Sequence, residues 1–293
     1  MKWLALLISL CLLITASAQA RVIHQEKSLY RNIIVEDVGN LRCLKFNVKS
    51  KQSNQSCMLK SEPKRLVFNY TKLLFSGMLL NDNPERILII GLGGGTMSNT
   101  LHELYPQATI DNVEIDPAVI KVARQYFNFI ENDNVRSYVK DGRIFIKRAL
   151  LKKQQYDWVI LDAFNGDYIP EHLLTKEFLT EVKSLLSEQG ILLSNTFSSS
   201  ELYNFESATY QAVFGEFFNV NNSRNENRII LAANKPLPEK SKLKEKLSEL
   251  HEKLAVYGVN MMKVYRAINT KQDWPQDSAI LTDQYSPANL LKN

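Results

Sequence analysis

The chain has 293 residues, of which 45% are hydrophobic and 23% are charged, and its formal net charge is +5 at pH 7. This composition is ordinary for a globular protein, and the length allows one large domain, a smaller one and a substantial core. Lys and Arg are spread along the chain with Asp and Glu between them. The charge is therefore too mild and too mixed to indicate nucleic acid as a partner.

The first twenty residues are expected to be a signal peptide. Lys2 supplies a short positive region, an apolar run covers residues 3–14, and Ala18-Gln19-Ala20 offers small residues for cleavage. The apolar run is too short and wrongly flanked for a transmembrane helix. We expect cleavage after Ala20, a periplasmic or secreted protein and no stable membrane span afterwards; an uncleaved membrane anchor is the alternative.

Removal of the signal peptide leaves two cysteines, Cys43 and Cys57. In an oxidising compartment they can pair across a β-hairpin. Two cysteines do not decide the matter, so a disulfide and two free, partly buried thiols both stay open.

Residues 21–83 are expected to form an N-terminal β-rich domain with a linking helix. Residues 30–38 and 41–47 alternate apolar and polar side chains around Gly39-Asn40, which is typical of a hairpin, and a short strand follows at 56–59. Apolar residues at helical spacing then predict a helix over 66–80.

From residue 84 to 293 the pattern changes to strands alternating with helices. The predicted strands cover 87–90, 108–114, 135–140, 156–162 and 190–195, and the predicted helices cover 98–105, 117–127, 143–152 and 176–186. This alternation predicts a parallel sheet with helices on both faces. Weaker patterns predict a helix over 207–217, a strand over 228–233 and a charged amphipathic helix ending near Gly258.

A glycine-rich turn, Gly91-Leu-Gly93-Gly94-Gly95-Thr96, follows the first of these strands and opens a helix. Glycines let the backbone turn tightly and let a ligand approach the N–H groups at the helix start. The spacing suits nucleosides without a pyrophosphate, and the strand–turn–helix context favours a binding role over a simple turn. We expect Gly91, Gly93 and Gly95 to contact such a ligand.

Acidic residues end the next two strands. Glu114 lies about twenty residues beyond the glycines, where a carboxylate can accept hydrogen bonds from both ribose hydroxyls. Asp141 can accept from an adenine amine or can instead cap the following helix, whereas Asp116 before Pro117 is expected to be a helix cap. Since parallel strands end at one edge of the sheet, these groups predict one nucleoside site.

Asp162 ends the fourth strand and borders the same crevice. A carboxylate there can orient an amine nucleophile and take its proton as it attacks a sulfonium-activated carbon. Asp167 can add negative charge that recruits a cation, although loop capping is its more ordinary role. His172 is expected at the surface, at a helix start, with a role in binding the substrate as the less favoured alternative. The four histidines are widely separated, so no metal site is expected.

Taken together, these motifs resemble those of the spermidine and spermine synthase family. The resemblance is carried by Gly91-Leu-Gly-Gly-Gly-Thr, Val113-Glu-Ile-Asp, Lys140-Asp-Gly-Arg, Leu161-Asp-Ala-Phe and Leu281-Thr-Asp-Gln-Tyr-Ser-Pro. It is closest to a variant branch often fused to membrane transporters. It implies an α/β protein with a small N-terminal β-domain and a Rossmann-like domain of the S-adenosylmethionine-dependent methyltransferase fold, commonly assembled as a homodimer or tetramer.

The resemblance also implies an activity, transfer of an aminopropyl group from decarboxylated S-adenosylmethionine to a polyamine such as putrescine. Glu114 would bind the ribose, Asp141 the adenine, and Asp162 would be the catalytic carboxylate. Gln55 would contact the nucleoside, and Tyr70 would line the amine channel.

Three departures reduce negative charge where the family binds two cationic groups. Gly94 stands where the family has an aspartate that meets the donor's ammonium, and Asn165 replaces a second acidic residue. Lys72 follows the channel tyrosine, and its positive charge would repel a diamine.

Two alternatives to aminopropyl transfer therefore stay open. Gly94 favours an S-adenosylmethionine-dependent methyltransferase of the same fold. The signal peptide favours a non-catalytic exported protein that binds an adenosyl compound or a polyamine, because S-adenosylmethionine is made in the cytosol.

Overall fold

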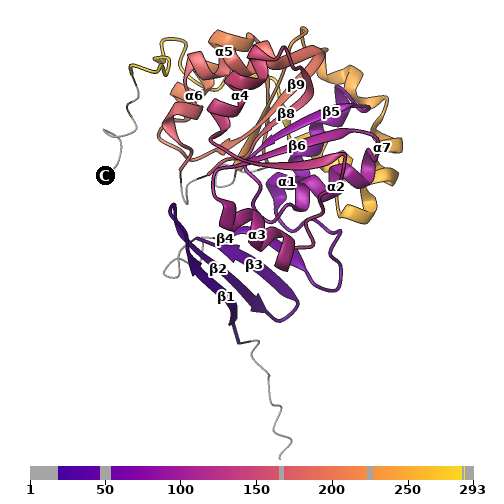
Figure 1. Cartoon of the computed structure of the whole chain (residues 1–293). Coiled ribbons are helices and arrows are strands. Elements are labelled where there is room, and N and C mark those ends of the chain that lie inside the picture. Colours follow the sequence, from indigo (N-terminus) through magenta and orange to yellow (C-terminus); the bar gives the residue numbers. More distant parts are fainter. Residues whose placement is uncertain (1–18, 47–53, 165–167, 223–226, 286, 288–293) are drawn as a thin grey trace, which may run out of the picture.

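The computed structural model describes residues 19–46, 54–164, 168–222, 227–285 and 287 (Figure 1). Most of the predicted signal peptide, together with Asn165 and Asp167, lies outside the described residues. The described part contains a four-stranded sheet near the N-terminus and an eight-stranded sheet covered by helices, which confirms the predicted α/β class.

The N-terminal sheet is antiparallel throughout. It consists of β1 (Arg21–Lys27), β2 (Asn32–Val38), β3 (Leu41–Lys45) and β4 (Asn54–Leu59), paired in that order. Alternate residues of β2 and β3, such as Val35 and Leu44, are fully buried and pack against Val122 of the neighbouring helix α3 (Pro117–Tyr126). This packing seats the small sheet beside the larger one (Figure 1).

The register of β3 and β4 decides between a disulfide and two free thiols. Cys43 and Cys57 are directly opposite each other and form a disulfide, with both side chains buried. The hairpin is thus closed covalently as well as by its hydrogen bonds.

The linking segment differs from the predicted helix over 66–80. An α-helix, α1, covers only Asn69–Leu73, and a 3₁₀ helix, η1, continues over Leu74–Leu79. All of η1 is buried, and a Cβ on Gly77 would lie 2.8 Å from a methyl of Leu193. Close packing on the sheet therefore overrides the helical periodicity. The boundary predicted near residue 84 falls between η1 and β5.

Five strands of the large sheet are parallel, as predicted: β5 (Arg86–Ile90), β6 (Thr109–Glu114), β7 (Val135–Val139), β8 (Tyr156–Leu161) and β9 (Leu186–Phe197). Three antiparallel strands extend it: β10 (Phe218–Val220), β11 (Asn227–Ala233) and β12 (Ile268–Asn269). The order is β12-β10-β11-β9-β8-β5-β6-β7. The strand order reverses at β5, which is where folds of this type bind ligands.

Helices cover both faces of the sheet (Figure 1). Besides α1 and α3 they are α2 (Thr96–Leu104), α4 (Gly142–Leu151), α5 (Lys176–Leu185), α6 (Tyr203–Phe214), α7 (Leu247–Leu254) and α8 (Met261–Ala267), with short 3₁₀ turns η2 (Glu171–Leu173), η3 (Lys240–Lys244) and η4 (Ala255–Tyr257). Consecutive residues of β8, Trp158 and Val159, belong to two separate hydrophobic clusters, one on each face. The charged helix expected before Gly258 is divided into η3, α7 and η4.

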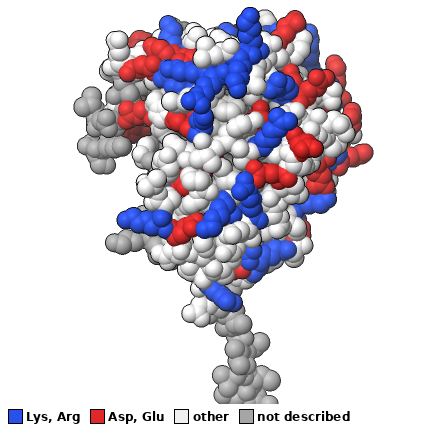
Figure 2. All heavy atoms as spheres, in the orientation of Figure 1, with Lys and Arg blue, Asp and Glu red and all other residues white. Residues whose placement is uncertain are grey.

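In the described part of the chain, no helix combines the length and the apolar character needed to cross a bilayer. On the face shown in Figure 2, Lys and Arg side chains lie among Asp and Glu side chains, as their mixed order in the sequence leads one to expect.

Candidate active site

A cavity of about 290 Å³ lies where the small sheet meets the carboxyl ends of β5, β6 and β8. The small sheet supplies side chains such as Phe46 and Ser56 to one wall, and the strand ends of the large sheet supply the other. Seven predicted site residues line it: Gly91, Gly93, Glu114, Asp141, Asp162, Gln55 and Tyr70. Residues far apart in the sequence thus meet at the switch point of the sheet.

Two of the predicted glycines shape the cavity floor and a third does not reach it. Gly91 has a φ of 95°, and a Cβ there would lie 2.3 Å from the carbonyl oxygen of Asp162, so only glycine fits. Gly93 also has positive φ and lines the cavity. Gly95 is absent from the cavity wall: it is the N-cap of α2, and its Cα faces the ring of Phe129. Its position favours a structural role over the predicted ligand contact.

Gly94 has no room for the side chain that the family resemblance leads one to expect. A Cβ at this position would lie 2.8 Å from Ser56 Oγ and 3.0 Å from the ring of Phe127. The space is filled by β4 on one side and by the end of α3 on the other. The close packing around Gly94 therefore explains why this chain has no carboxylate at that position.

Glu114 is held rigidly at the end of β6. Its Oε2 accepts a hydrogen bond from the backbone N–H of Leu92 at 3.1 Å, and its Oε1 accepts one from Asp116 at 3.0 Å. Burial raises the pKa of Glu114, against the effect of these two bonds. Each oxygen keeps a further lone pair for a ligand hydroxyl. Asp116 accepts from the N–H of Ala118, which confirms its predicted role as a helix cap.

Asp141 caps α4, which is one of the two roles that the sequence left open, and its second oxygen contacts a histidine; the adenine contact stays a prediction. Its Oδ1 accepts from the N–H of Ile144 and caps α4, while its Oδ2 lies 3.0 Å from Nε2 of His172. Both Asp141 and His172 line the cavity, although the His172 side chain is 48% exposed. His172 is exposed in the helical turn η2, as predicted, and its pairing with Asp141 was not predicted.

Asp162 lies at the end of β8 between two hydrogen-bond donors. The Tyr70 hydroxyl donates to Oδ2 at 3.2 Å, and the Asn195 amide donates to Oδ1 at 2.8 Å. Burial raises the pKa of Asp162 to about 7, against the opposing effect of these two bonds. Burial also raises the pKa of Tyr70 well above its usual value, so the phenol stays a donor. A carboxylate with a pKa near neutrality is suited to act as a general base.

Arg31 and Asn195 are site residues that were not predicted. Arg31, from the β1–β2 turn, donates through Nη1 to the carbonyl of Phe164 at 3.1 Å and packs over the ring of Phe46. No local pattern marks this arginine, because its partner is 133 residues away. Asn195 ends the strand predicted over 190–195, although β9 continues to Phe197; it follows the last β8–β9 pair, Leu161 with Ser194, and so lies level with Asp162.

Lys72 does not line the cavity, contrary to the expectation that it would repel a diamine. The cavity-lining neighbour of Tyr70 is Thr71. Burial lowers the pKa of Lys72, and the charges of Arg65 and Lys263 lower it further. These neighbours place its ammonium group beside α8, on the other side of α1.

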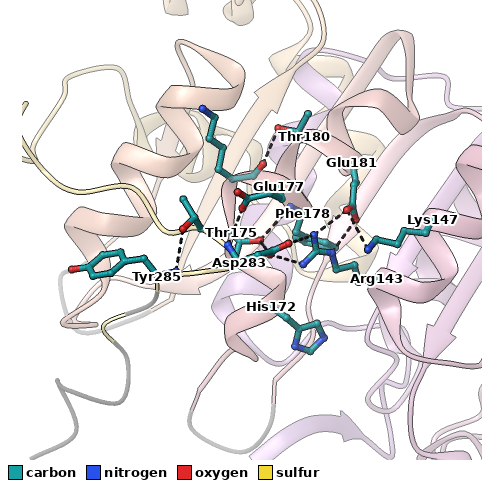
Figure 3. Close-up of polar contacts among 12 residues, drawn as sticks. Arg143, Lys147, His172, Thr175, Glu177, Phe178, Thr180, Glu181, Asp283 and Tyr285 are labelled. Atoms are coloured by element: carbon teal, nitrogen blue, oxygen red, sulfur yellow. Dashed lines mark hydrogen bonds and ion pairs between the residues drawn. The ribbon is translucent and has the colours of Figure 1, made fainter.

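The C-terminal segment is fastened next to the Lys140-Asp-Gly-Arg motif (Figure 3). Arg143 on α4 bonds to Glu181 on α5 and, through both terminal nitrogens, to Asp283 at 2.6 and 2.7 Å. Asp283 also accepts from the hydroxyl of Thr175, the N-cap of α5. This network holds the start of α4, and with it Asp141, against α5 and the chain end.

Within the described ranges, no group of three or more His, Cys, Asp or Glu side chains could hold a metal ion. Asp167 and Asn165, which belong to the segment after Asp162, lie outside those ranges. The substrate-binding role predicted for Asp167 therefore stays a prediction.

Comparison with known proteins identifies the family of this chain and proteins that share its fold. Residues 68–222 match the family model of the spermine/spermidine synthase domain. The chain is 45% identical to a polyamine aminopropyltransferase of Vibrio vulnificus, with 97% of this chain and 96% of that protein covered. A crystal structure of a probable spermidine synthase from Corynebacterium glutamicum shares the fold, with a TM-score of 0.66 at 19% identity over 87% of this chain and 97% of that one.

A second group of relatives consists of methyltransferases. Over 44% of its length the chain is 31% identical to the Bos taurus eEF1A lysine and N-terminal methyltransferase, of which it covers 21%. This match is shorter and weaker than the one to the aminopropyltransferase. The chain belongs to the spermidine and spermine synthase family and is a homologue of polyamine aminopropyltransferases, which are transferases of polyamine biosynthesis.

Proposed function

We propose that this protein transfers an aminopropyl group from decarboxylated S-adenosylmethionine to a polyamine such as putrescine. The observation that carries the proposal is Asp162, a carboxylate with a pKa near 7 that faces the cavity between Tyr70 and Asn195. The same cavity contains Glu114 and Asp141, which suit the ribose and the adenine of the donor. The family uses the decarboxylated donor as co-substrate, which supports this assignment.

The proposed reaction is a direct displacement assisted by these side chains. An amine nitrogen attacks the methylene carbon beside the donor's sulfonium, so that a C–N bond forms while the C–S bond breaks and methylthioadenosine leaves. The new ammonium then gives a proton to the Asp162 carboxylate. Tyr70 and Asn195 hold that carboxylate in place, which keeps its distance to the attacking nitrogen short.

Methyl transfer from S-adenosylmethionine is the second candidate, because the cavity lacks a carboxylate at Gly94 and contains the positive charge of Arg31. The Asp116 carboxylate, 3.8 Å from Nε of Arg31, offsets part of this positive charge, and the remainder favours a carboxylated donor over one that ends in an ammonium. The shared fold serves both reactions, so the choice depends on the donor.

Calorimetric titration with decarboxylated S-adenosylmethionine, S-adenosylmethionine and methylthioadenosine tests the donor assignment. We expect tighter binding of the decarboxylated donor, lost in Glu114→Ala and kept in Glu188→Ala, whose side chain is 83% exposed and does not line the cavity. Tighter binding of the carboxylated donor would favour methyl transfer. If none of the three ligands binds, the nucleoside site itself is wrong.

We also propose that the protein is exported and cleaved after Ala20. Support comes from the charged start, short apolar run and small residues of the N-terminal segment, and from the Cys43–Cys57 disulfide, which suits an oxidising compartment. Cell fractionation with mass analysis of the N-terminus tests this. Full-length protein in the cytosol would contradict it.

A further inference from the structure

We propose that Asn227 is a positioning residue that fixes the orientation of the Asn195 amide and, through it, the ionisation of Asp162. The inference rests on the proposed function only for its effect on turnover. Nδ2 of Asn227 donates to Oδ1 of Asn195 at 2.9 Å, and Nδ2 of Asn195 donates to Oδ1 of Asp162 at 2.8 Å. Three neighbouring strands, β11, β9 and β8, thus supply one line of hydrogen bonds that ends at the proposed base.

A primary amide has one end that donates and one that accepts, and the two ends have nearly the same shape. The two partners of Asn195 therefore decide together which of its ends meets Asp162. The ionised carboxylate only accepts, so it favours the amide nitrogen, and Asn227 fixes that orientation by donating to the amide oxygen on the far side. Reversal would place oxygen against oxygen, and Asp162 would then have to keep a proton to make the contact.

The surroundings make this arrangement rigid. Asn195 is 2% exposed, so its amide has no alternative partner in bulk water. Asn195 pairs with Ile229 in the β9–β11 register, which puts Asn227 two residues along β11 on the same face. The next residue, Arg228, is fully buried and bonds to Thr196 and Glu206. This anchor holds the start of β11, and Asn227 with it, in register.

Two substitutions of Asn227 separate this role from a merely structural one. In Asn227→Asp the new carboxylate must accept from the amide nitrogen of Asn195, which turns the amide and presents its oxygen to Asp162. In Asn227→Ala the amide is free to adopt either orientation. We therefore expect the pKa of Asp162 to rise in both variants and to rise more in Asn227→Asp, by about one pH unit or more.

The pKa of Asp162 is measured by NMR titration of protein labelled with ¹³C in the aspartate carboxyl groups, with Asp162→Asn used to assign the resonance. Asn234→Asp, just beyond the other end of β11, is the control for an added charge and should leave the titration unchanged. Asn227→Ala adds no charge, so a rise of the Asp162 pKa in that variant cannot come from a through-space charge effect and points to the amide.

Turnover supplies the second readout. The pH at half-maximal kcat/KM should move upward together with the NMR pKa in both Asn227 variants. An unchanged Asp162 pKa in folded Asn227→Asp and Asn227→Ala would overturn the inference. If the unmodified protein turns over no amine with either donor, the proposed function fails, yet the NMR titration still decides the role of Asn227.

Discussion

Burial of Asp162 affects both its suitability as a general base and the stability of the protein. Its pKa rises from 3.8 to about 7, which means that the folded protein holds the proton more tightly than the unfolded chain does. The free energy of unfolding attributable to this group is therefore largest below about pH 4 and falls as the pH rises toward 7. Above about pH 7 the folded protein holds a buried negative charge that lowers its stability, as expected for a base that must be ionised to act.

Replacement of this carboxylate should separate activity from stability. We expect Asp162→Asn to abolish aminopropyl transfer and to raise the melting temperature relative to the unmodified protein at pH 8, but not at pH 4. Thermal unfolding of both proteins at the two pH values checks this. Equal differences at pH 4 and pH 8 would mean that Asp162 titrates normally.

The glycine turn offers a second test at single positions. Gly95 has a φ of 72°, and a Cβ there would lie 2.5 Å from the ring of Phe129, whereas Gly94 has ordinary backbone angles and a milder conflict with Ser56. We expect Gly95→Ala to lower the free energy of unfolding by about 2–3 kcal/mol and Gly94→Ala by about 1 kcal/mol. Urea denaturation measures both. Relief of the Gly94→Ala loss by Ser56→Ala would locate the conflict at the serine hydroxyl, and the reverse ranking would contradict this account of the turn.

Among the elements, the β3–β4 hairpin connects the disulfide with the cavity. The bond closes a loop with a sequence separation of 14, and β4 places Gln55 and Ser56 in the cavity wall next to Cys57. Replacing both cysteines by alanine should lower the free energy of unfolding by about 3 kcal/mol and should weaken donor binding. Denaturation and calorimetry of Cys43→Ala/Cys57→Ala test this. Unchanged donor affinity would show that the hairpin positions its side chains without the bond.

The C-terminal segment is the second element with a measurable contribution. Hydrogen bonds from Arg143 lower the pKa of Asp283 to about 2, so the stability gained is present above about pH 4 and is lost as the pH falls through 2. The Asp283 side chain is 41% exposed, and solvent screening reduces the expected effect to about 1 kcal/mol.

A double-mutant cycle with Arg143→Met and Asp283→Asn, carried out at pH 7 and at pH 2, isolates this contribution. We expect a coupling free energy at pH 7 that largely disappears at pH 2. A coupling that does not depend on pH would show that the two side chains act through packing rather than through charge.

At the scale of the whole molecule, local patterns predicted the elements that build the site. The strands ending at Ile90, Glu114 and Leu161 are buried runs, of which the first is followed by Gly91, the second ends in Glu114 itself and the third is followed by Asp162, so both their type and their shared edge could be predicted. The antiparallel strands β10 and β12 are short, with three and two residues, and leave no periodic signal. Their pairing depends on contacts between distant parts of the chain.

The contrast between local patterns and distant contacts also separates the site residues that could be predicted from those that could not. Glu114 and Asp162 are defined by their place at strand ends, whereas Arg31 and Asn227 act through partners 133 and 32 residues away. The burial that raises the pKa of Asp162 also depends on the packing of the small sheet and α1 above it. Such environments arise only from the assembled fold, so a sequence pattern can name the carboxylate but cannot give its pKa.

The central claim is that Asp162 catalyses aminopropyl transfer in this cavity. The most direct test incubates the purified protein with decarboxylated S-adenosylmethionine and putrescine and follows methylthioadenosine and spermidine by mass spectrometry. We predict equal amounts of the two products, a kcat/KM that rises with pH to a plateau above about pH 7, and loss of both products in Asp162→Asn. Methylthioadenosine and spermidine formed at an unchanged rate by folded Asp162→Asn would contradict the account.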